Sequence, residues 1–311
     1  MVDRAAFAPV PRGAYSELTD LVQLRHPARD LKLNKQRKTF SPLVGPHQSR
    51  FRGRGIEFDE VRAYQAGDDV RNIDWRVTAR SGRPHTKLFH EERERPVLLL
   101  VDQGLPMFFG SKNCFKSVMA AHVAALLAWA ALQQNDRVGG LVFCGAKRAE
   151  IRPKRNAKTV LQLLRDIDLF NRRLHRQLPP AEVGLCEALE ELRRITRPGS
   201  NIFVVSDFRN CHGEGEKHLH QLSRHNDIAA VQIYDPLEQQ LPPSGSYSVT
   251  DGSRRAHLFT GDSRLRQQYQ QNFAKKTETL RQLMGPMGIP LLQVSTQESP
   301  LQYFRNLLGK Q

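Results

Sequence analysis

Acidic side chains gather in one segment in a pattern that could support hydrolysis. Asp68, Asp69, Asp74 and Glu92 all fall within residues 51–94. Carboxylate clusters of this kind hold metal ions in nucleases. Arginines are their nearest charged neighbours along the chain, so we favour ion pairs that fix the geometry of the segment and add little net stability. A metal-dependent hydrolase remains the weaker alternative.

Two glycines in the same segment could cradle a phosphate. Gly53 and Gly55 stand among arginines. The chain lacks a Gly-x-x-x-x-Gly-Lys-Ser/Thr run at this place, and no clear buried strand precedes the glycines. We therefore interpret them as a turn.

Two predicted strands end in aspartate. Residues 97–101 and 202–205 are continuous apolar runs, as expected of strands that are buried on both faces. Asp102 follows the first run and Asp207 the second, after Ser206. In parallel α/β sheets ligands bind beyond the carboxyl ends of the strands. The sequence therefore predicts that both carboxylates converge at the ligand-binding edge of one sheet.

The elements that position these residues alternate between strands and helices. Further buried strands are predicted at 138–144, 228–234 and 289–294, and a hairpin at 246–260. Helices are predicted at 112–134, 157–169, 185–195, 216–224, 263–284 and 300–308. This alternation predicts an α/β fold, a mainly parallel sheet with helices on both faces.

The remaining chain divides into two further parts. Residues 1–50 are expected to form a short helix within 14–25 and then a basic connector. In residues 51–95, charges of both signs alternate with single aromatics, among them Tyr64 and Trp75. This pattern predicts a β-rich extension with half-buried aromatics and paired ions. Residues 96–311 then form the α/β domain.

The extension carries a long multi-part motif. It comprises Gly53, Gly55, Glu57, Phe58, Arg62, Tyr64, Gly67, Asp68, Asp69, Arg71, Asp74, Trp75 and Arg80. This motif resembles the signature of the domain of unknown function 58 family, and Ser206-Asp207-Phe208 is similar to a later part of it. The resemblance implies a von Willebrand factor A-like (Rossmann-type) α/β domain behind an N-terminal β-rich extension.

Domains of that fold often carry a metal-ion-dependent adhesion site. Its pattern is Asp-x-Ser-x-Ser after the first strand, a threonine in a second loop and a later aspartate, all oxygen ligands for magnesium. Here Gly104 and Pro106 replace the serines, and Val183 stands near the threonine position. Only Asp102 and Asp207 match the metal-binding pattern. The resemblance thus implies a degenerate site in which Mg²⁺ is disfavoured and no cofactor is expected, the alternative being that both aspartates are structural and accept hydrogen bonds from loop amides or arginines.

Members of the family are commonly associated with MoxR-type AAA+ ATPases. The resemblance therefore implies a non-enzymatic adaptor in a chaperone-like assembly. By analogy its partner surface lies at the carboxyl end of the sheet, around Asp102, Gly104, Val183 and Asp207.

The charge of the chain indicates anionic partners. The 311 residues carry a formal net charge of +15, concentrated in residues 32–54 and 147–158, which are expected to be solvated basic loops. Nucleic acid is the main alternative partner, and an anionic membrane surface also fits. No apolar run approaches the roughly 20 residues of a membrane helix, and no signal peptide is evident. We expect a cytoplasmic protein that is peripheral at the inner face of the membrane.

Overall fold

The protein divides into two compact units. The computed structural model describes residues 10–33, 56–65, 68, 70–91, 95–174, 184–209, 211, 213–250 and 255–308. One unit, here called the α/β unit, comprises residues 1–46 and 96–311, and the other, the extension unit, comprises residues 47–95.

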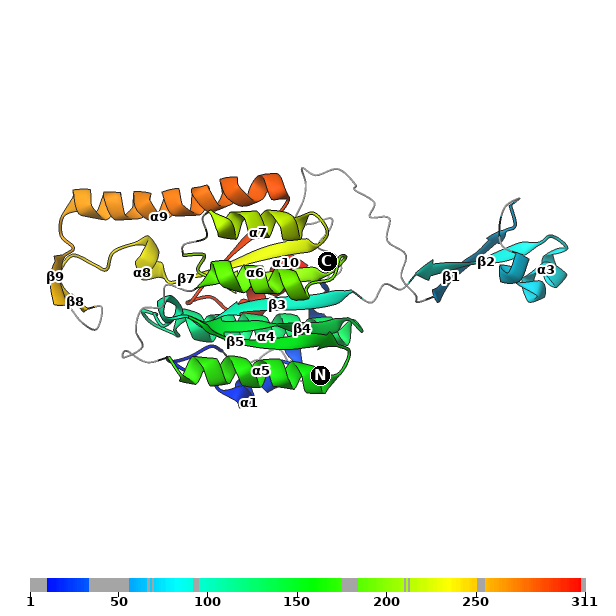
Figure 1. Cartoon of the computed structure of the whole chain (residues 1–311), viewed down its shortest axis with the longest axis horizontal. Coiled ribbons are helices and arrows are strands. Elements are labelled where there is room, and N and C mark those ends of the chain that lie inside the picture. Colours follow the sequence, from blue (N-terminus) through cyan, green and yellow to red (C-terminus); the bar gives the residue numbers. More distant parts are fainter. Residues whose placement is uncertain are drawn as a thin grey trace. The chain divides into compact units, whose positions relative to one another are not determined.

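A six-stranded sheet forms the centre of the α/β unit (Figure 1). Its strands are β3 (Pro96–Asp102), β4 (Arg137–Cys144), β5 (Lys147–Lys154), β6 (Asn201–Ser206), β7 (Asp227–Tyr234) and β10 (Leu291–Ser295). The order is β10-β7-β6-β3-β4-β5, and only β5 runs antiparallel to its neighbour. When the six strands are numbered by their sequence order within this unit, their spatial order is that of a doubly wound sheet. The predicted α/β fold, a mainly parallel sheet, is confirmed.

Helices cover both faces of this sheet because the side chains of each strand alternate in direction. In β3, Leu99 and its odd-numbered neighbours pack in one core with α4 (Lys116–Gln133), α5 (Ala157–Arg172) and α10 (Pro300–Leu308). Leu98 and Leu100 pack in a second core with α6 (Leu185–Ile195), α7 (Glu214–Ser223) and α9 (Ser263–Met284).

Helix α4 is the central helix of the first core. Among the described residues it is the one helix long and apolar enough to cross a membrane, but 89% of it is buried inside the protein. The N-terminal residues also cover it, through α1 (Leu18–Gln23) and the 3-10 turn η2 (Pro27–Asp30). The Trp129 indole donates to the carbonyl of Leu21 at 3.0 Å. The short helix expected within 14–25 is therefore present as α1, and it packs on α4.

The basic residues 147–154 form strand β5 and not the predicted loop. Ile151 alone in this strand is fully buried, so the alternation that marks a strand is weak. The pairing with β4 shifts register opposite Gly139, where a side chain would meet the backbone of Ile151 and Pro153. Charges, a bulge and a proline are devices that protect the exposed edge of a sheet from pairing with another chain.

An insertion after β7 carries α8 (Pro236–Gln239) and the predicted hairpin, β8 (Ser246–Thr250) paired with β9 (Arg255–Phe259). The 3-10 turns η5 (Leu105–Met107) and η6 (Gly285–Met287) complete this unit.

The extension unit is a two-stranded hairpin with a short helix. Its elements are β1 (Ile56–Ala63), the 3-10 turn η4 (Val70–Asn72), α3 (Trp75–Ser81) and β2 (His85–Glu91). The predicted ion pairing is present between Arg62 and Asp68, 2.8 Å apart. The expectation of a half-buried Trp75 is wrong, because 70% of this residue is exposed.

Some motif positions of this unit fall outside the description. The described residues do not include the motif residues Gly53, Gly55, Gly67 and Asp69 or the side chains of Glu57 and Phe58. They also do not include Glu92 of the predicted carboxylate cluster. Of the other motif residues, Tyr64 donates its hydroxyl to the carbonyl of Asp68 at 3.3 Å. Arg71 and Arg80 are exposed.

The backbone of Gly140 in β4 lies very close to the neighbouring strand β3. A Cβ at this position would lie 2.1 Å from the carbonyl oxygen of Leu99 in β3. We expect Gly140→Ala to lower the free energy of unfolding by about 1–3 kcal/mol, the usual cost of overpacking. Urea titrations measure this difference. Gly285→Ala is the matched control, since nothing lies within 4 Å of its Cβ position. Equal stability of the two variants would contradict the packing described.

A buried lysine among the strand-end carboxylates

Asp102 ends β3 at the carboxyl edge of the sheet and is 8% exposed. Its Oδ1 accepts the backbone N–H of Gly104 at 2.8 Å, and its Oδ2 accepts the Ser206 hydroxyl at 2.6 Å. A Cβ at position 104 would lie 3.0 Å from Asp102 Oδ1. Glycine at this position therefore lets the loop fold tightly back onto the carboxylate.

Ser206 joins the ends of the two central strands. Besides donating to Asp102, its oxygen accepts the backbone N–H of Phe208 at 3.1 Å. Phe208 has a φ of 53°, a left-handed conformation that is rare for a bulky residue, and its side chain is buried. The hydroxyl and the buried ring together hold this turn, which aims Asp207 at α4.

Asp207 binds a lysine that the sequence analysis missed. Lys116 stands at the first position of α4 with a side chain that is 0% exposed, and its Nζ lies 2.9 Å from Asp207 Oδ2. The other oxygen of Asp207 accepts the backbone N–H of Arg209 at 2.9 Å. The Arg209 guanidinium adds a longer contact of 3.6 Å to Oδ2.

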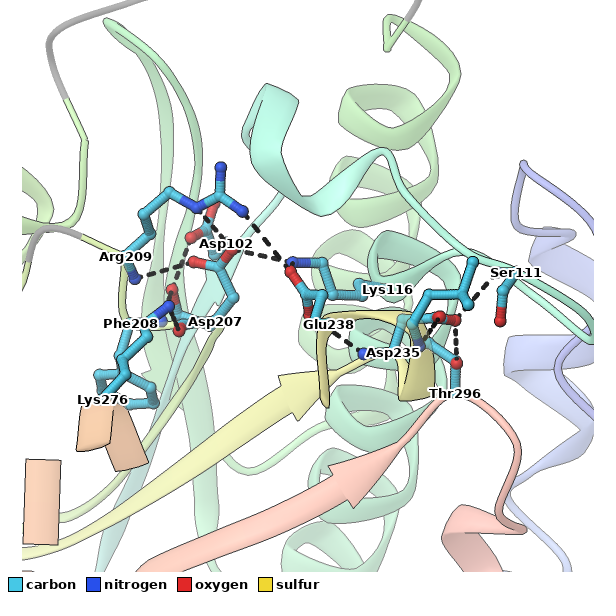
Figure 2. A network of polar contacts seen from close by, with 12 residues as sticks. Asp102, Ser111, Lys116, Asp207, Phe208, Arg209, Asp235, Glu238, Lys276 and Thr296 are labelled. Atoms are coloured by element: carbon cyan, nitrogen blue, oxygen red, sulfur yellow. Dashed lines mark hydrogen bonds and ion pairs between the residues drawn. The ribbon is translucent and has the colours of Figure 1, made fainter. Parts of the chain in front are cut away.

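Glu238 completes the surroundings of the lysine. Its Oε1 lies 2.8 Å from Lys116 Nζ and 3.5 Å from Arg209, and its Oε2 accepts the backbone N–H of Asp235 at 3.1 Å (Figure 2). Asp235 follows β7 and is fully buried. It accepts the hydroxyl of Thr296 at 2.6 Å. One network thus joins the ends of β6, β7 and β10 to the start of α4.

The two aspartates differ in their electrostatics. Burial, and then the nearby charge of Asp207, raise the pKa of Asp102 to about 7. Burial alone would also raise the pKa of Asp207, but the charge and hydrogen bond of Lys116 outweigh it and hold that pKa below the ordinary value. The ammonium thus keeps Asp207 ionised beside a carboxyl group that tends to remain protonated.

This arrangement does not fit a divalent cation. Every carboxylate oxygen of Asp102 and Asp207 already accepts a hydrogen bond from the protein. The ammonium of Lys116 contacts Asp207 from within the core and would repel a metal ion there. Across the described residues, no group of three or more His, Cys, Asp and Glu side chains is placed to hold a metal.

The structure brings Asp102, Gly104 and Asp207 together at one edge of the sheet. Val183 lies outside the described residues. Lys116, Ser206, Asp235 and Glu238 were missed, although two signals were available. A lone lysine opens an otherwise apolar helix, and Asp235-Pro236-Leu237-Glu238 is a capping box, which the structure confirms.

A cleft of about 280 Å³ opens beside the network. Asp207, Arg209 and Glu238 line it on one side, and Tyr269 and Lys276 of α9 on the other. Lys276 reaches the backbone carbonyl of Asp207 at 3.5 Å. The exposed edge of the network is therefore a polar surface with two accessible cations.

Comparison with known proteins identifies relatives of this chain. The model of the family described as "Protein of unknown function DUF58" matches residues 60–279. An uncharacterized protein of Mycobacterium tuberculosis is 29% identical over 273 residues, covering 86% of this chain and 83% of that protein. An uncharacterized protein of Mycobacterium bovis matches equally well.

Solved structures show more distant similarity. The conserved hypothetical protein BatB from Bacteroides thetaiotaomicron is 14% identical with a TM-score of 0.43, over 68% of this chain and 96% of that one. The manganese-loaded TRAP protein of Plasmodium vivax is 13% identical with a TM-score of 0.36, over 70% and 74%.

Removal of the buried ammonium should be costly. We expect Lys116→Met to lower the free energy of unfolding by about 3–5 kcal/mol, because it leaves buried carboxylate charge uncompensated. Adding Glu238→Gln should restore part of this loss, since the two residues are coupled. Lys276→Met is the control and should cost less than about 1 kcal/mol, since this exposed residue pairs only weakly. Equal losses in urea titrations would refute the assigned role of Lys116.

The raised pKa of Asp102 predicts a pH dependence. The folded protein keeps the Asp102 proton up to about pH 7, whereas the unfolded chain loses it near 3.8. This group therefore lowers the stability as pH rises through that window, by up to about 1.4 kcal/mol per pH unit. Asparagine does not titrate, so Asp102→Asn should not lose stability in this way. The free energy of unfolding of the variant minus that of the natural protein should therefore rise with pH and level off above pH 7. A constant difference between pH 4 and 7 would refute the shift.

Proposed function

The chain belongs to the DUF58 family, and we propose that it is a non-enzymatic protein-interaction protein, an adaptor for a MoxR-type AAA+ ATPase in a chaperone-like assembly. The observation that supports this most is the position of Lys116. A lysine ammonium is fully buried against Asp207, one of the two aspartates that match the adhesion-type pattern. We infer that the adhesion site is degenerate and that its cation is supplied by the chain itself.

A site of this kind suits recognition better than catalysis. The carboxylates that an enzyme would use as a base or as metal ligands accept hydrogen bonds from the protein on every oxygen. The network instead fixes the loops that follow β3, β6 and β7 in one arrangement. Rigid loops at the carboxyl end of a sheet present a preformed surface, which lowers the entropic cost of binding a partner.

The proposed partner surface is formed by exposed neighbours of Asp102, Gly104 and Asp207, and Val183 lies outside the described residues. Pro106 and Phe109 of the loop after β3 are exposed, Phe109 to 41%. The side chain of Arg209 is 51% exposed. Arginine and aromatic residues are frequent hot spots of protein interfaces.

Nucleic acid remains the rival partner. It would use residues 32–54, most of which lie outside the described residues, and residues 147–158 on β5 and the start of α5. Part of the charge on β5 is already paired, since Arg148 lies 2.7 Å from Glu191 and Arg152 lies 3.7 Å from Glu150. A metal-dependent hydrolase is the weaker alternative.

The adaptor proposal predicts nucleotide-dependent binding. The full chain should bind the MoxR-type ATPase encoded in the same genome with an affinity that differs between its ADP and ATP-analogue states. Arg209→Glu should weaken binding by about tenfold or more, as expected for a hot-spot arginine. Arg152→Glu, which reverses an even more exposed charge on β5, should leave the affinity unchanged. Biolayer interferometry measures both variants.

Three outcomes would contradict the proposal. One is an affinity that ignores nucleotide state and Arg209. Another is an affinity for DNA or RNA whose logarithm falls linearly with the logarithm of the salt concentration. The third is calorimetric binding of magnesium or manganese that Asp102→Ala abolishes, which would favour the hydrolase.

A further inference from the structure

The cleft beside the strand-end network lies against the first half of helix α9. Its walls come from the ends of β6 and β7, from α8 and from α9, which extends beyond the end of the sheet (Figure 1). Tyr269, Asn272, Phe273 and Lys276 line it at the three- and four-residue steps that place side chains on one helix face. The buried residues of α9 all follow this stretch. The first half of the helix therefore contributes this face to the cleft and not to the core.

The guanidinium of Arg209 is held loosely at the cleft. It contacts Asp207 Oδ2 at 3.6 Å and Glu238 Oε1 at 3.5 Å. Strong charge-assisted hydrogen bonds measure about 2.7–2.9 Å, and Lys116 makes such bonds to the same two oxygen atoms, at 2.9 and 2.8 Å. Because the buried ammonium already compensates both carboxylates, the half-exposed arginine is available to another anion.

Lys276 faces the same space from α9. Its Nζ contacts the backbone carbonyl of Asp207 at 3.5 Å, which is also a long distance. Burial is the largest cause that lowers the pKa of Lys276, and the attraction of Asp207 and Glu238 does not offset it. The ammonium therefore has too little negative charge around it, and a bound anion would stabilise it.

The charges around the cleft do not balance. Among the described residues, three cations meet two carboxylates here, and these groups belong to Lys116, Arg209, Lys276, Asp207 and Glu238. The next carboxylate, that of Asp235, accepts the backbone N–H of Ser111 and the hydroxyl of Thr296 on the other side of Glu238 (Figure 2). Asp102 is protonated below its pKa of about 7. One positive charge is therefore in excess, so the cleft favours an anion with a single negative charge.

An aromatic wall stands beside the two cations. The rings of Tyr234 and Phe273 pack with their centroids 5.5 Å apart, and both residues line the cleft. Tyr269 is fixed next to them, because its hydroxyl donates to the carbonyl of Leu237 at 2.9 Å. A ligand that fills the volume of about 280 Å³ thus needs a small apolar group next to its charge.

We propose that this cleft binds a carboxylate joined to a small apolar group. Arg209 and Lys276 bind the carboxylate oxygens, and the apolar group packs against Tyr234 and Phe273. A planar carboxylate matches the guanidinium fork, whereas the second charge of a phosphate would be repelled by Asp207, which lines the same cleft. The carboxylate comes from a free acid or from the C-terminal residue of a polypeptide. Only the second source rests on the proposed adaptor function.

Calorimetric titration of the full chain provides the first test, at pH 6 so that Asp102 is protonated. The probe 3-phenylpropionate should bind with a dissociation constant below about 1 mM, as expected of a small ligand. Its neutral amide should bind at least about tenfold more weakly, because it lacks the charge that the two cations bind. Inorganic phosphate should also bind at least about tenfold more weakly.

Three variants locate the binding. Arg209→Gln should weaken the binding of 3-phenylpropionate by about tenfold and Lys276→Gln by about fivefold, since each removes one charged donor. Lys275→Gln is the matched control, because it removes the adjacent exposed charge of α9 that does not line the cleft, and it should change the affinity by less than about twofold. Urea titrations verify that each variant is folded, and the comparison of acid with amide needs no variant at all.

A tripeptide that ends in phenylalanine distinguishes the two sources. Tighter binding of this peptide than of 3-phenylpropionate, lost when its carboxyl end is amidated, assigns the cleft to a polypeptide end. Weaker binding assigns it to a free acid. None of these measurements contains the ATPase, so a failure of the adaptor proposal would leave the result for the free acid unchanged.

Four results would overturn the inference. The first is that neither 3-phenylpropionate nor the peptide binds. The second is equal affinity for acid and amide, which would remove the role of the two cations. The third is phosphate binding as tight as that of the acid, which would make the cleft a general anion site. The fourth is an equal loss in Lys275→Gln and Lys276→Gln, which would assign the attraction to the charge of α9 as a whole.

Discussion

The architecture of the strand-end site depends on one buried ammonium group. Removing a lysine from water costs several kcal/mol, and only close carboxylates compensate for that cost. Lys116 has two of them, Asp207 at 2.9 Å and Glu238 at 2.8 Å. One comes from the end of β6 and the other from α8, so the charge can be buried only when both loops are in place. The pair therefore specifies a geometry more than it adds stability.

The remaining loop contacts follow from this constraint. Asp207 can face α4 because Phe208 adopts a left-handed turn that Ser206 supports. Ser206 in turn holds Asp102, and the absence of a side chain at Gly104 leaves room for that carboxylate. The Cβ of a serine at position 104 would lie 3.0 Å from Asp102 Oδ1. The loop sequence and the internal cation thus fit one another, and neither fits a metal ion.

The sequence predicts those parts of the fold that depend on long apolar runs. Strands buried on both faces, such as β3 and β6, are visible as such runs, and their final aspartates fall where a doubly wound sheet must place them. Strand β5 escaped prediction because a single buried residue, Ile151, lies among basic ones. Lys116 escaped because its partners come from distant segments, 91 and 122 residues away. Trp75 was misjudged because alternation of charge and aromatics does not reveal which aromatic faces water.

The distribution of charge separates the strand-end site from the basic parts of the chain. At the strand ends, Lys116 and Arg209 are matched by Asp207 and Glu238, so this region contributes little to the net charge of +15. The excess lies on β5, on the exposed arginines of α3 and in residues 32–54. An internally neutralised surface binds by shape and a few hot spots, and its affinity depends weakly on salt.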